Sequence, residues 1–454
     1  MDHKITFVGI KPWVLLGFII LFASCSDTKW SQFRGPGNNM VAENSNLPDD
    51  WGMGKNIRWT YDLTGTGWSS PVVWGNNVFI ASAFAEKKSP VKPEEPEGAE
   101  GSDEQEQEKE DTSYLNDVYR WEVTCIDLKT GKKLWEQVAR KGNPRVGAES
   151  GNTYASETPV TDGKRVYVYF GMTGVFCYDF SGNLVWQKDL GAYPTLNSWG
   201  TGSSPVLFQD LLFIQIDNEK SSFIVALNAA DGEEKWRAER QEKTNYSTPV
   251  IWKNKIRNEL VTAGTRARSY DPATGKLLWE LKLGGEMSIA SPVADQDHLY
   301  IGIGRGEVDK GNFYAVKAGA EGDITPAEGQ QISNGIAWSQ PKAEVGVTSP
   351  LLHNGLIYFL GGRGGKMSCF DAATGDSVYR AKADSVASCW ASPWVNNGKI
   401  FLTDEKGTTH VFKAGKKFEL LSRNKLTDKI WSSVAITKDA YILKGVKSLY
   451  CIGK

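Results

Sequence analysis

Few side chains in this sequence have the type and spacing that chemistry requires. Glu157, Asn197 and Asn245 offer carboxylate and amide oxygens of the kind that calcium binds. Each of them also fits the simpler role of bonding backbone groups at the end of a strand. Three of the 4 histidines, His298, His353 and His410, are too widely separated to match a metal-binding motif. No Ser-His-Asp or phosphate-loop pattern is present, so we predict no catalytic residue and no resident metal or cofactor.

Large aromatic side chains form a second candidate site. Four of them stand three residues before the proline position of a short motif that recurs along the chain: Trp68, Tyr246, Trp390 and Trp431. Such rings could stack a planar ligand, a carbohydrate ring or a side chain of a partner. They could equally fill the axis of a closed sheet, as side chains do in small barrels. With Glu157 and Asn245 they make up a candidate binding site at the mouth of a channel.

The recurring motif reveals the elements that position these residues. It reads Ser/Thr-Pro followed by an apolar residue, at Ser70-Pro71, Thr158-Pro159, Ser204-Pro205, Thr248-Pro249, Ser291-Pro292, Ser349-Pro350 and Ser392-Pro393, with an eighth copy, Ser433-Val434, that lacks the proline. Successive prolines are 88, 46, 44, 43, 58 and 43 residues apart, so the common period is about 44 residues with two insertions. A turn and an apolar strand follow each motif. This period is typical of a four-stranded propeller blade.

A second pattern ends each repeat with a strand, a turn and an aromatic residue. One copy is Cys177-Tyr-Asp-Phe-Ser-Gly-Asn-Leu-Val-Trp186. Asp and Gly close such a turn through side-chain bonding and a positive φ angle. The aromatic residues assigned to this position are Trp59, Trp135, Trp186, Trp236, Trp279, Trp338, Tyr379 and Phe418. We predict that they dock between neighbouring blades, which assigns these six tryptophans to structure.

The pattern Ala/Cys-x-Asp-x-x-Thr-Gly-x-x-x-Trp resembles the tryptophan-docking repeat of the PQQ-like, or quinoprotein-type, β-propeller family. The resemblance covers residues 57–454 and implies an all-β fold, an eight-bladed β-propeller of four-stranded antiparallel blades. The chain ends on a third strand, at residues 448–454, without a fourth strand after it. Residues 57–63 match a fourth strand, so we predict that this N-terminal strand completes the last blade and removes the open edges.

Two functions are compatible with this resemblance. PQQ-dependent dehydrogenases of the family hold their quinone with a vicinal disulfide, a tryptophan floor and a calcium ion bound by Glu, Asn and Asp. The present sequence has no Cys-Cys pair. Its architecture is also similar to that of the propeller lipoprotein of the outer-membrane β-barrel assembly machinery, which binds partners without chemistry. We predict a non-catalytic, monomeric envelope scaffold that binds protein or glycan through one propeller face. The alternative is a dehydrogenase that oxidises alcohols or sugars with PQQ and calcium.

The N-terminal residues resemble an export signal. Residues 1–24 combine lysines with a short apolar run, as signal peptides do. Phe22-Ala-Ser-Cys25 resembles a lipobox, so we predict lipidation at Cys25, with an ordinary secretory signal as the alternative. The mature chain is then exported and anchored by its lipid, in our prediction at the outer membrane, facing the periplasm or the cell surface. Residues 25–56 form a tether and entry segment, in which Trp30-Ser-Gln-Phe-Arg-Gly-Pro-Gly37 is expected to cross a face of the disc.

Charge argues against one class of partner. The chain has 52 Lys+Arg and 54 Asp+Glu, a net charge of -2, and so lacks the basic field that attracts nucleic acid. Residues 86–114 form an acidic insertion in the first blade, with 11 acidic and 4 basic residues between Glu86 and Asp111. Such a segment buries too little apolar surface to order itself, so we expect a disordered loop. It is either a solvated insertion without function or a charged segment that attracts a basic partner.

Overall fold

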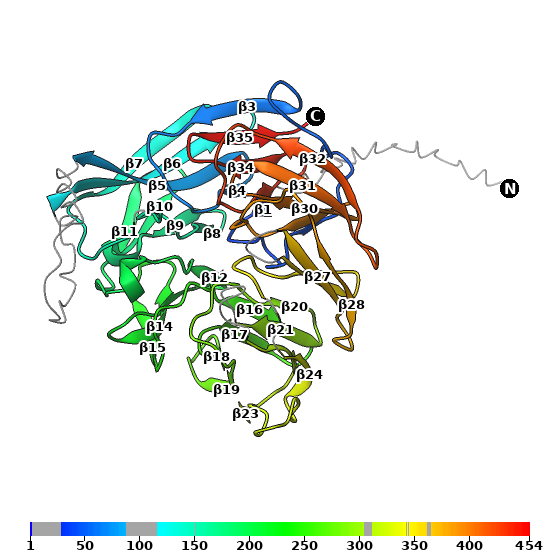
Figure 1. Cartoon of the computed structure of the whole chain (residues 1–454). Coiled ribbons are helices and arrows are strands. Elements are labelled where there is room, and N and C mark those ends of the chain that lie inside the picture. Colours follow the sequence, from blue (N-terminus) through cyan, green and yellow to red (C-terminus); the bar gives the residue numbers. More distant parts are fainter. Residues whose placement is uncertain are drawn as a thin grey trace, which may run out of the picture.

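Eight small sheets surround one axis in the computed structural model of the chain (Figure 1). The structure describes residue 1 and residues 29–87, 116–149, 151–303, 311–341, 343, 345–360 and 365–454. The fold is all-β, as predicted, and each sheet corresponds to one sequence repeat. The signal peptide, Cys25 and almost all of the acidic insertion lie outside the described residues and stay predictions. Within the described part, no helix has the length and apolarity needed to span a membrane.

The first four blades follow the chain from the axis outwards. Blade one has β4 (Val72–Trp74), β5 (Asn77–Lys87), β6 (Val118–Asp127) and β7 (Lys133–Gly142); blade two has β8 (Val160–Thr161), β9 (Arg165–Tyr169), β10 (Val175–Asp179) and β11 (Leu184–Lys188). Blade three has β12 (Val206–Phe208), β13 (Leu211–Ile216), β14 (Ser222–Asn228) and β15 (Glu234–Arg240); blade four has β16 (Val250–Lys253), β17 (Asn258–Thr262), β18 (Arg266–Tyr270) and β19 (Leu277–Lys282). Among the described residues, the 3-10 turn η2 (Gly171–Thr173) lies between β9 and β10, and the 3-10 turn η3 (Leu196–Ser198) lies between blades two and three.

The remaining blades repeat this arrangement. Blade five has β20 (Val293–Ala294), β21 (His298–Gly302), β22 (Phe313–Lys317) and β24 (Ile336–Gln340); blade six has β25 (Leu351–His353), β26 (Leu356–Leu360), β27 (Lys366–Asp371) and β28 (Ser377–Lys382). Blade seven has β29 (Trp394–Asn396), β30 (Lys399–Thr403), β31 (Thr408–Lys413) and β32 (Leu420–Lys425); blade eight has β33 (Ala435–Ile436), β34 (Tyr441–Lys444), β35 (Ser448–Ile452) and β3 (Ile57–Asp62). Three further short strands add to blades one, seven and four: β1 (Lys29–Trp30) pairs with β4, β2 (Val41–Ala42) with β29, and β23 (Gly322–Asp323) with β19.

The ring closes by pairing the start of the propeller with the end of the chain. β3 runs antiparallel to β35, with Trp59 opposite Cys451, and Figure 1 shows the blue β3 beside the red β35. This confirms the predicted closure. Lys444 on β34 ties the same seam, because its buried ammonium group donates to the carbonyls of Gly67 (2.8 Å) and Ala81 (2.9 Å) in blade one.

The Ser/Thr-Pro motifs form a second ring close to the axis. In each link the backbone N–H of one motif donates to the hydroxyl oxygen of the next, for example from Ser70 to Thr158 at 2.9 Å. Seven such links are found among the described residues. One of them crosses the seam, from the N–H of Ser433 to the hydroxyl of Ser70 at 3.0 Å. Each of these hydroxyl oxygens accepts from the buried N–H of a neighbouring motif. A buried N–H needs a hydrogen-bond partner, which explains why Ser or Thr recurs at this position.

Most of the docking tryptophans lie between blades, on glycines of the next blade. The indole N–H of Trp186 donates to the carbonyl of Ala229 at 3.0 Å, and its ring covers Gly232. Gly232 has φ +75°, and a Cβ there would lie 2.7 Å from the ring, so only glycine fits. The same arrangement holds for Trp59, Trp135, Trp236 and Trp338.

Two of the assigned docking residues behave differently. The N–H of Trp279 donates to Glu259 of its own blade at 2.7 Å, because blade five joins its third and fourth strands by a long connection in place of the tight Asp-Gly turn. In blade seven the strand register places Ser422 at the docking position, and Phe418 lies in the preceding turn, against Tyr379. The assignment of Phe418 to the docking position is therefore wrong, because this turn is longer than the tight docking turns of the other blades, blade five excepted.

Residues 29–42 cross the axis between blades one and seven. β1 and β2 extend the inner edges of these two blades, and Arg34 lies between them in the sequence. The Arg34 guanidinium donates to the carbonyls of Pro292 (2.9 Å) and Pro350 (2.7 Å), in blades five and six. The entry segment therefore runs across one end of the axis from blade one to blade seven and contacts blades five and six on the way.

Candidate functional site

The inner strands give the disc two distinct faces. We call the side where the first strand of each blade begins the entry face, and the side where it ends the exit face. The four candidate aromatic residues precede β4, β16, β29 and β33, so they belong to the entry face. The entry segment is named for its place near the start of the chain, but its residues around Arg34 lie at the exit face of the disc. The turn after β33 lies at the same face.

Three of the four aromatics form one continuous stack. The rings of Trp68 and Trp431 stack with centroids 4.3 Å apart, and those of Trp431 and Trp390 with centroids 4.6 Å apart. Interplanar angles of 23° and 21° keep the three rings nearly parallel. Trp390 ends the stack and is 39% exposed. Blades seven, eight and one therefore present a single aromatic platform at the entry face.

Charged groups flank the platform. The Lys429 ammonium lies 4.5 Å from the ring centroid of Trp431, a cation-π distance, and the indole N–H of Trp390 faces a Glu405 oxygen at 3.4 Å. The indole N–H of Trp431 is buried and has no partner among the described residues. The sequence analysis missed Lys429 and Glu405, although the position of Lys429 two residues before Trp431 is a signal for the same side of an extended segment.

Tyr246 does not join this stack. It precedes the first strand of blade four, and no ring contact in the described part of the chain links it to the tryptophans. Its ring lies against Gly202, where a Cβ would be 3.4 Å away, and its buried hydroxyl has no partner among the described residues. Burial raises the pKa of this hydroxyl above the usual range for tyrosine.

Asn245 lines one small cavity beside blades two and three, and Glu157 contacts the wall of this cavity through Thr201. The cavity measures about 20 Å³, enough for about one water molecule, and Thr201, Asp217 and Asn245 are among its lining residues. The Thr201 hydroxyl donates to the carboxyl group of Glu157, which is fully buried. Burial raises the pKa of Glu157 to about 7.

The residues around this cavity do not fit calcium and a quinone. Asn197 is exposed and not among the lining residues. The Asn245 oxygen already accepts from the N–H of Ser288 at 2.7 Å, and Asp217 is ion-paired with buried Arg240 at 2.8 Å. Calcium needs six to eight oxygen ligands, and a tricyclic quinone needs a cavity of several hundred Å³. No group of three or more His, Cys, Asp or Glu residues within the described ranges could hold a metal ion.

The remaining reactive side chains are buried. His410 pairs with Asp404 at 2.9 Å, and both are almost fully covered. The five cysteines in the described part of the chain are free thiols. Four of them face the docking position of their own blade, and burial raises their pKa values to about 12: Cys125, Cys177, Cys369 and Cys451. Thiols in this state are poor nucleophiles, which fits a packing role.

The repeats and the ring of eight sheets define the chain as an eight-bladed β-propeller whose repeats resemble those of PQQ-like proteins. Residues 120–319 match a family model described as outer membrane protein assembly factor BamB. No curated protein sequence matches the chain.

Three solved structures extend the comparison. A quinohemoprotein alcohol dehydrogenase from Comamonas testosteroni has a TM-score of 0.61 at 11% identity, over 94% of this chain and 81% of that one. A europium-containing methanol dehydrogenase has a TM-score of 0.60 at 11% identity, over 93% and 90% of the two chains. BamB from Moraxella catarrhalis has a TM-score of 0.49 at 13% identity, over 73% and 91%. At these identities the two dehydrogenase structures establish a shared fold and carry no activity over to this chain.

Proposed function

We propose that this chain is a non-catalytic, exported scaffold that holds an envelope partner, protein or glycan, on its entry face. The observation that carries the proposal is the stack of Trp68, Trp431 and Trp390, which ends in an indole that is 39% exposed. Tryptophan is enriched at the energetic centres of interfaces, because it buries a large rigid surface at small entropic cost. The Lys429 ammonium and the Glu405 carboxylate supply polar groups at the rim.

Other features of the proposal come from the sequence. The chain reaches the envelope through its signal peptide, is anchored by the lipid on Cys25 alone, and acts as a monomer. The alternative of a PQQ-dependent dehydrogenase has less support, because Glu157, Asn197 and Asn245 do not converge on a common site with room for the cofactor.

The test compares two truncations in the same blade. Trp390→Ala removes the exposed end of the platform, whereas Leu421→Ala removes another exposed apolar side chain, 42% exposed, from the outer strand of blade seven. Each purified protein is incubated with a detergent extract of the cell envelope and with an array of envelope glycans. We expect a ligand that binds the unaltered protein and Leu421→Ala, and binds Trp390→Ala at least about tenfold more weakly. Equal binding by the two variants would refute the proposal.

A further inference from the structure

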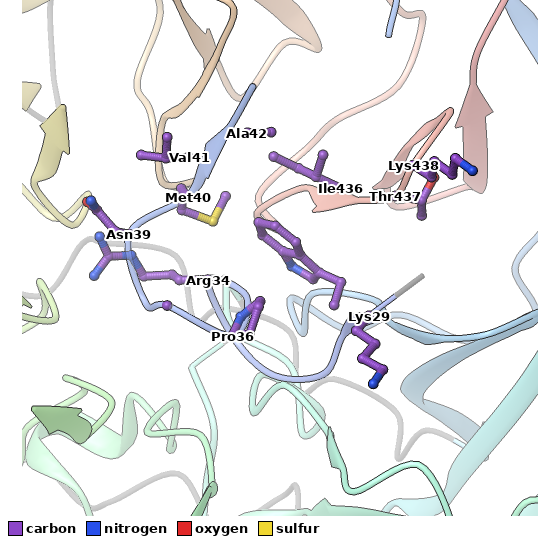
Figure 2. A pocket seen from close by; sticks show the side chains of 12 residues that line it. Lys29, Arg34, Pro36, Asn39, Met40, Val41, Ala42, Ile436, Thr437 and Lys438 are labelled. Carbon is purple, nitrogen blue, oxygen red and sulfur yellow. The ribbon is translucent and has the colours of Figure 1, made fainter. Parts of the chain in front are cut away.

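A cavity of ligand size opens on the exit face, on the other side of the disc from the tryptophan platform. It measures about 420 Å³, which lies within the usual range for small-molecule sites. The entry segment provides most of its wall, and the turn after β33 provides the rest. In Figure 2, Arg34 and Asn39 lie on one side of the pocket, and Ile436 and Lys438 lie on the other.

The charges that line this cavity are all positive. Lys29, Arg34 and Lys438 are among its twelve lining residues, and none of the twelve is acidic. Lys29 and Lys438 are exposed and form no ion pair within the described part of the chain. A concave surface lined by one sign of charge concentrates ligands of the opposite sign.

Arg34 strengthens this argument because its charge is buried without a counterion. It is 2% exposed, its three hydrogen bonds go to backbone carbonyls, and its Nε–H has no partner among the described residues. Desolvation lowers the pKa of Arg34 to about 9, and no nearby carboxylate opposes this shift. A buried unpaired cation is costly, and an anion in the adjoining cavity would reduce this cost.

Most of the remaining cavity wall is apolar, and the wall is held in place by hydrogen bonds to the blades. Trp30, Met40 and Ile436 are buried and supply hydrophobic surface. Asn39 fixes the segment to blade six through two bonds with Leu352, at 2.7 and 2.9 Å. The wall therefore exists before any ligand arrives, which lowers the entropic cost of binding.

We propose that this exit-face cavity binds a carboxylate carried on an apolar group, with the carboxylate attracted by the combined positive potential of Lys29, Lys438 and the buried Arg34 and the apolar group against Trp30, Met40 and Ile436. Two sources share this chemistry: a free carboxylic acid and the C-terminus of a peptide that ends in an apolar residue. Neither requires the entry-face platform, so this site is independent of the proposed scaffold function.

The experiment uses the full chain and probes that differ in charge. Octanoate, octanol and octylammonium are titrated into the protein by calorimetry. A blocked tetrapeptide ending in leucine is then titrated with its C-terminus free or amidated. We expect saturable one-to-one binding of octanoate or of the free-acid peptide, at least about tenfold tighter than binding of the uncharged analogue. Whichever carboxylate binds more tightly identifies the source.

Charge-reversed variants test whether the carboxylate binds in this cavity. The double variant Lys29→Glu and Lys438→Glu is compared with Lys416→Glu and Lys417→Glu, which make the same change at exposed lysines outside the cavity. We expect the first pair to weaken carboxylate binding at least about tenfold, and the second pair to leave it within about twofold. Trp390→Ala should leave it unchanged. Equal weakening by both pairs, equal affinity for octanoate and octanol, or no saturable binding of any probe would each overturn the proposal.

Discussion

Glu157 offers a direct test of the electrostatics beside the entry face. It is 1% exposed, and burial raises its pKa from 4.5 to about 7. Below the unfolded-state pKa both states carry the proton, so the group does not affect stability there. Between that value and pH 7 the unfolded state ionises while the folded state keeps its proton, so stability falls as pH rises. Over the full window this loss amounts to about 3 kcal/mol.

The Glu157→Gln variant removes this dependence, because glutamine keeps an oxygen that can accept from Thr201 and does not ionise. We expect the free energy of unfolding of the variant, relative to the unaltered protein, to increase by about 3 kcal/mol between pH 4.5 and 8. Urea denaturation followed by tryptophan fluorescence at several pH values measures this difference. Glu239→Gln makes the same atomic change at an exposed position and serves as the control. If the free energies of unfolding of Glu157→Gln and of the unaltered protein changed in parallel with pH, ionisation of the buried carboxyl would not destabilise the fold.

Three further predictions address the ring, the docking turns and the cofactor. Ser433→Ala removes the hydroxyl oxygen that accepts from the buried N–H of Ser392 and keeps the backbone link from Ser433 to Ser70 across the seam; it should cost about 1 kcal/mol in urea denaturation, whereas the exposed Ser45→Ala should cost nothing measurable. Gly232→Ala should destabilise more than Gly284→Ala, by at least about 1 kcal/mol, because both have positive φ but only the first meets an indole ring; equal losses would argue against tight docking. Protein incubated with PQQ and calcium should retain no quinone absorbance after gel filtration, and stoichiometric retention would favour the dehydrogenase alternative.

The propeller could be predicted from the sequence because each blade repeats its own local signals. The Ser/Thr-Pro motif and the Asp-Gly turn recur at a fixed spacing, so an error in one repeat does not alter the rest. Phe418 shows where this reasoning fails. An aromatic near the expected position was assigned to docking, but the longer turn shifted the register and placed Ser422 there. Spacing alone does not determine register where a turn changes length.

The candidate site was only partly predictable for a related reason. Sequence placed four aromatics at equivalent positions, but equivalent positions in a ring are neighbours only in adjacent blades. Trp390, Trp431 and Trp68 come from blades seven, eight and one and stack, whereas Tyr246 comes from blade four. The exit-face cavity could not be predicted, because the entry segment lies outside the repeats. Its partners in blades five and six are more than 250 residues away along the chain.

The pairing of β3 with β35 also constrains how the chain matures. A ribosome releases residues 57–62 long before residues 448–452, so the eighth blade can assemble only after both strands have been synthesised. Until then β3 has no strand partner and the ring stays open, although blades one to seven each take their four main strands from one continuous stretch of the chain. A polypeptide truncated before β35 would leave β3 without its partner strand and the ring open at this seam, with unpaired sheet edges exposed.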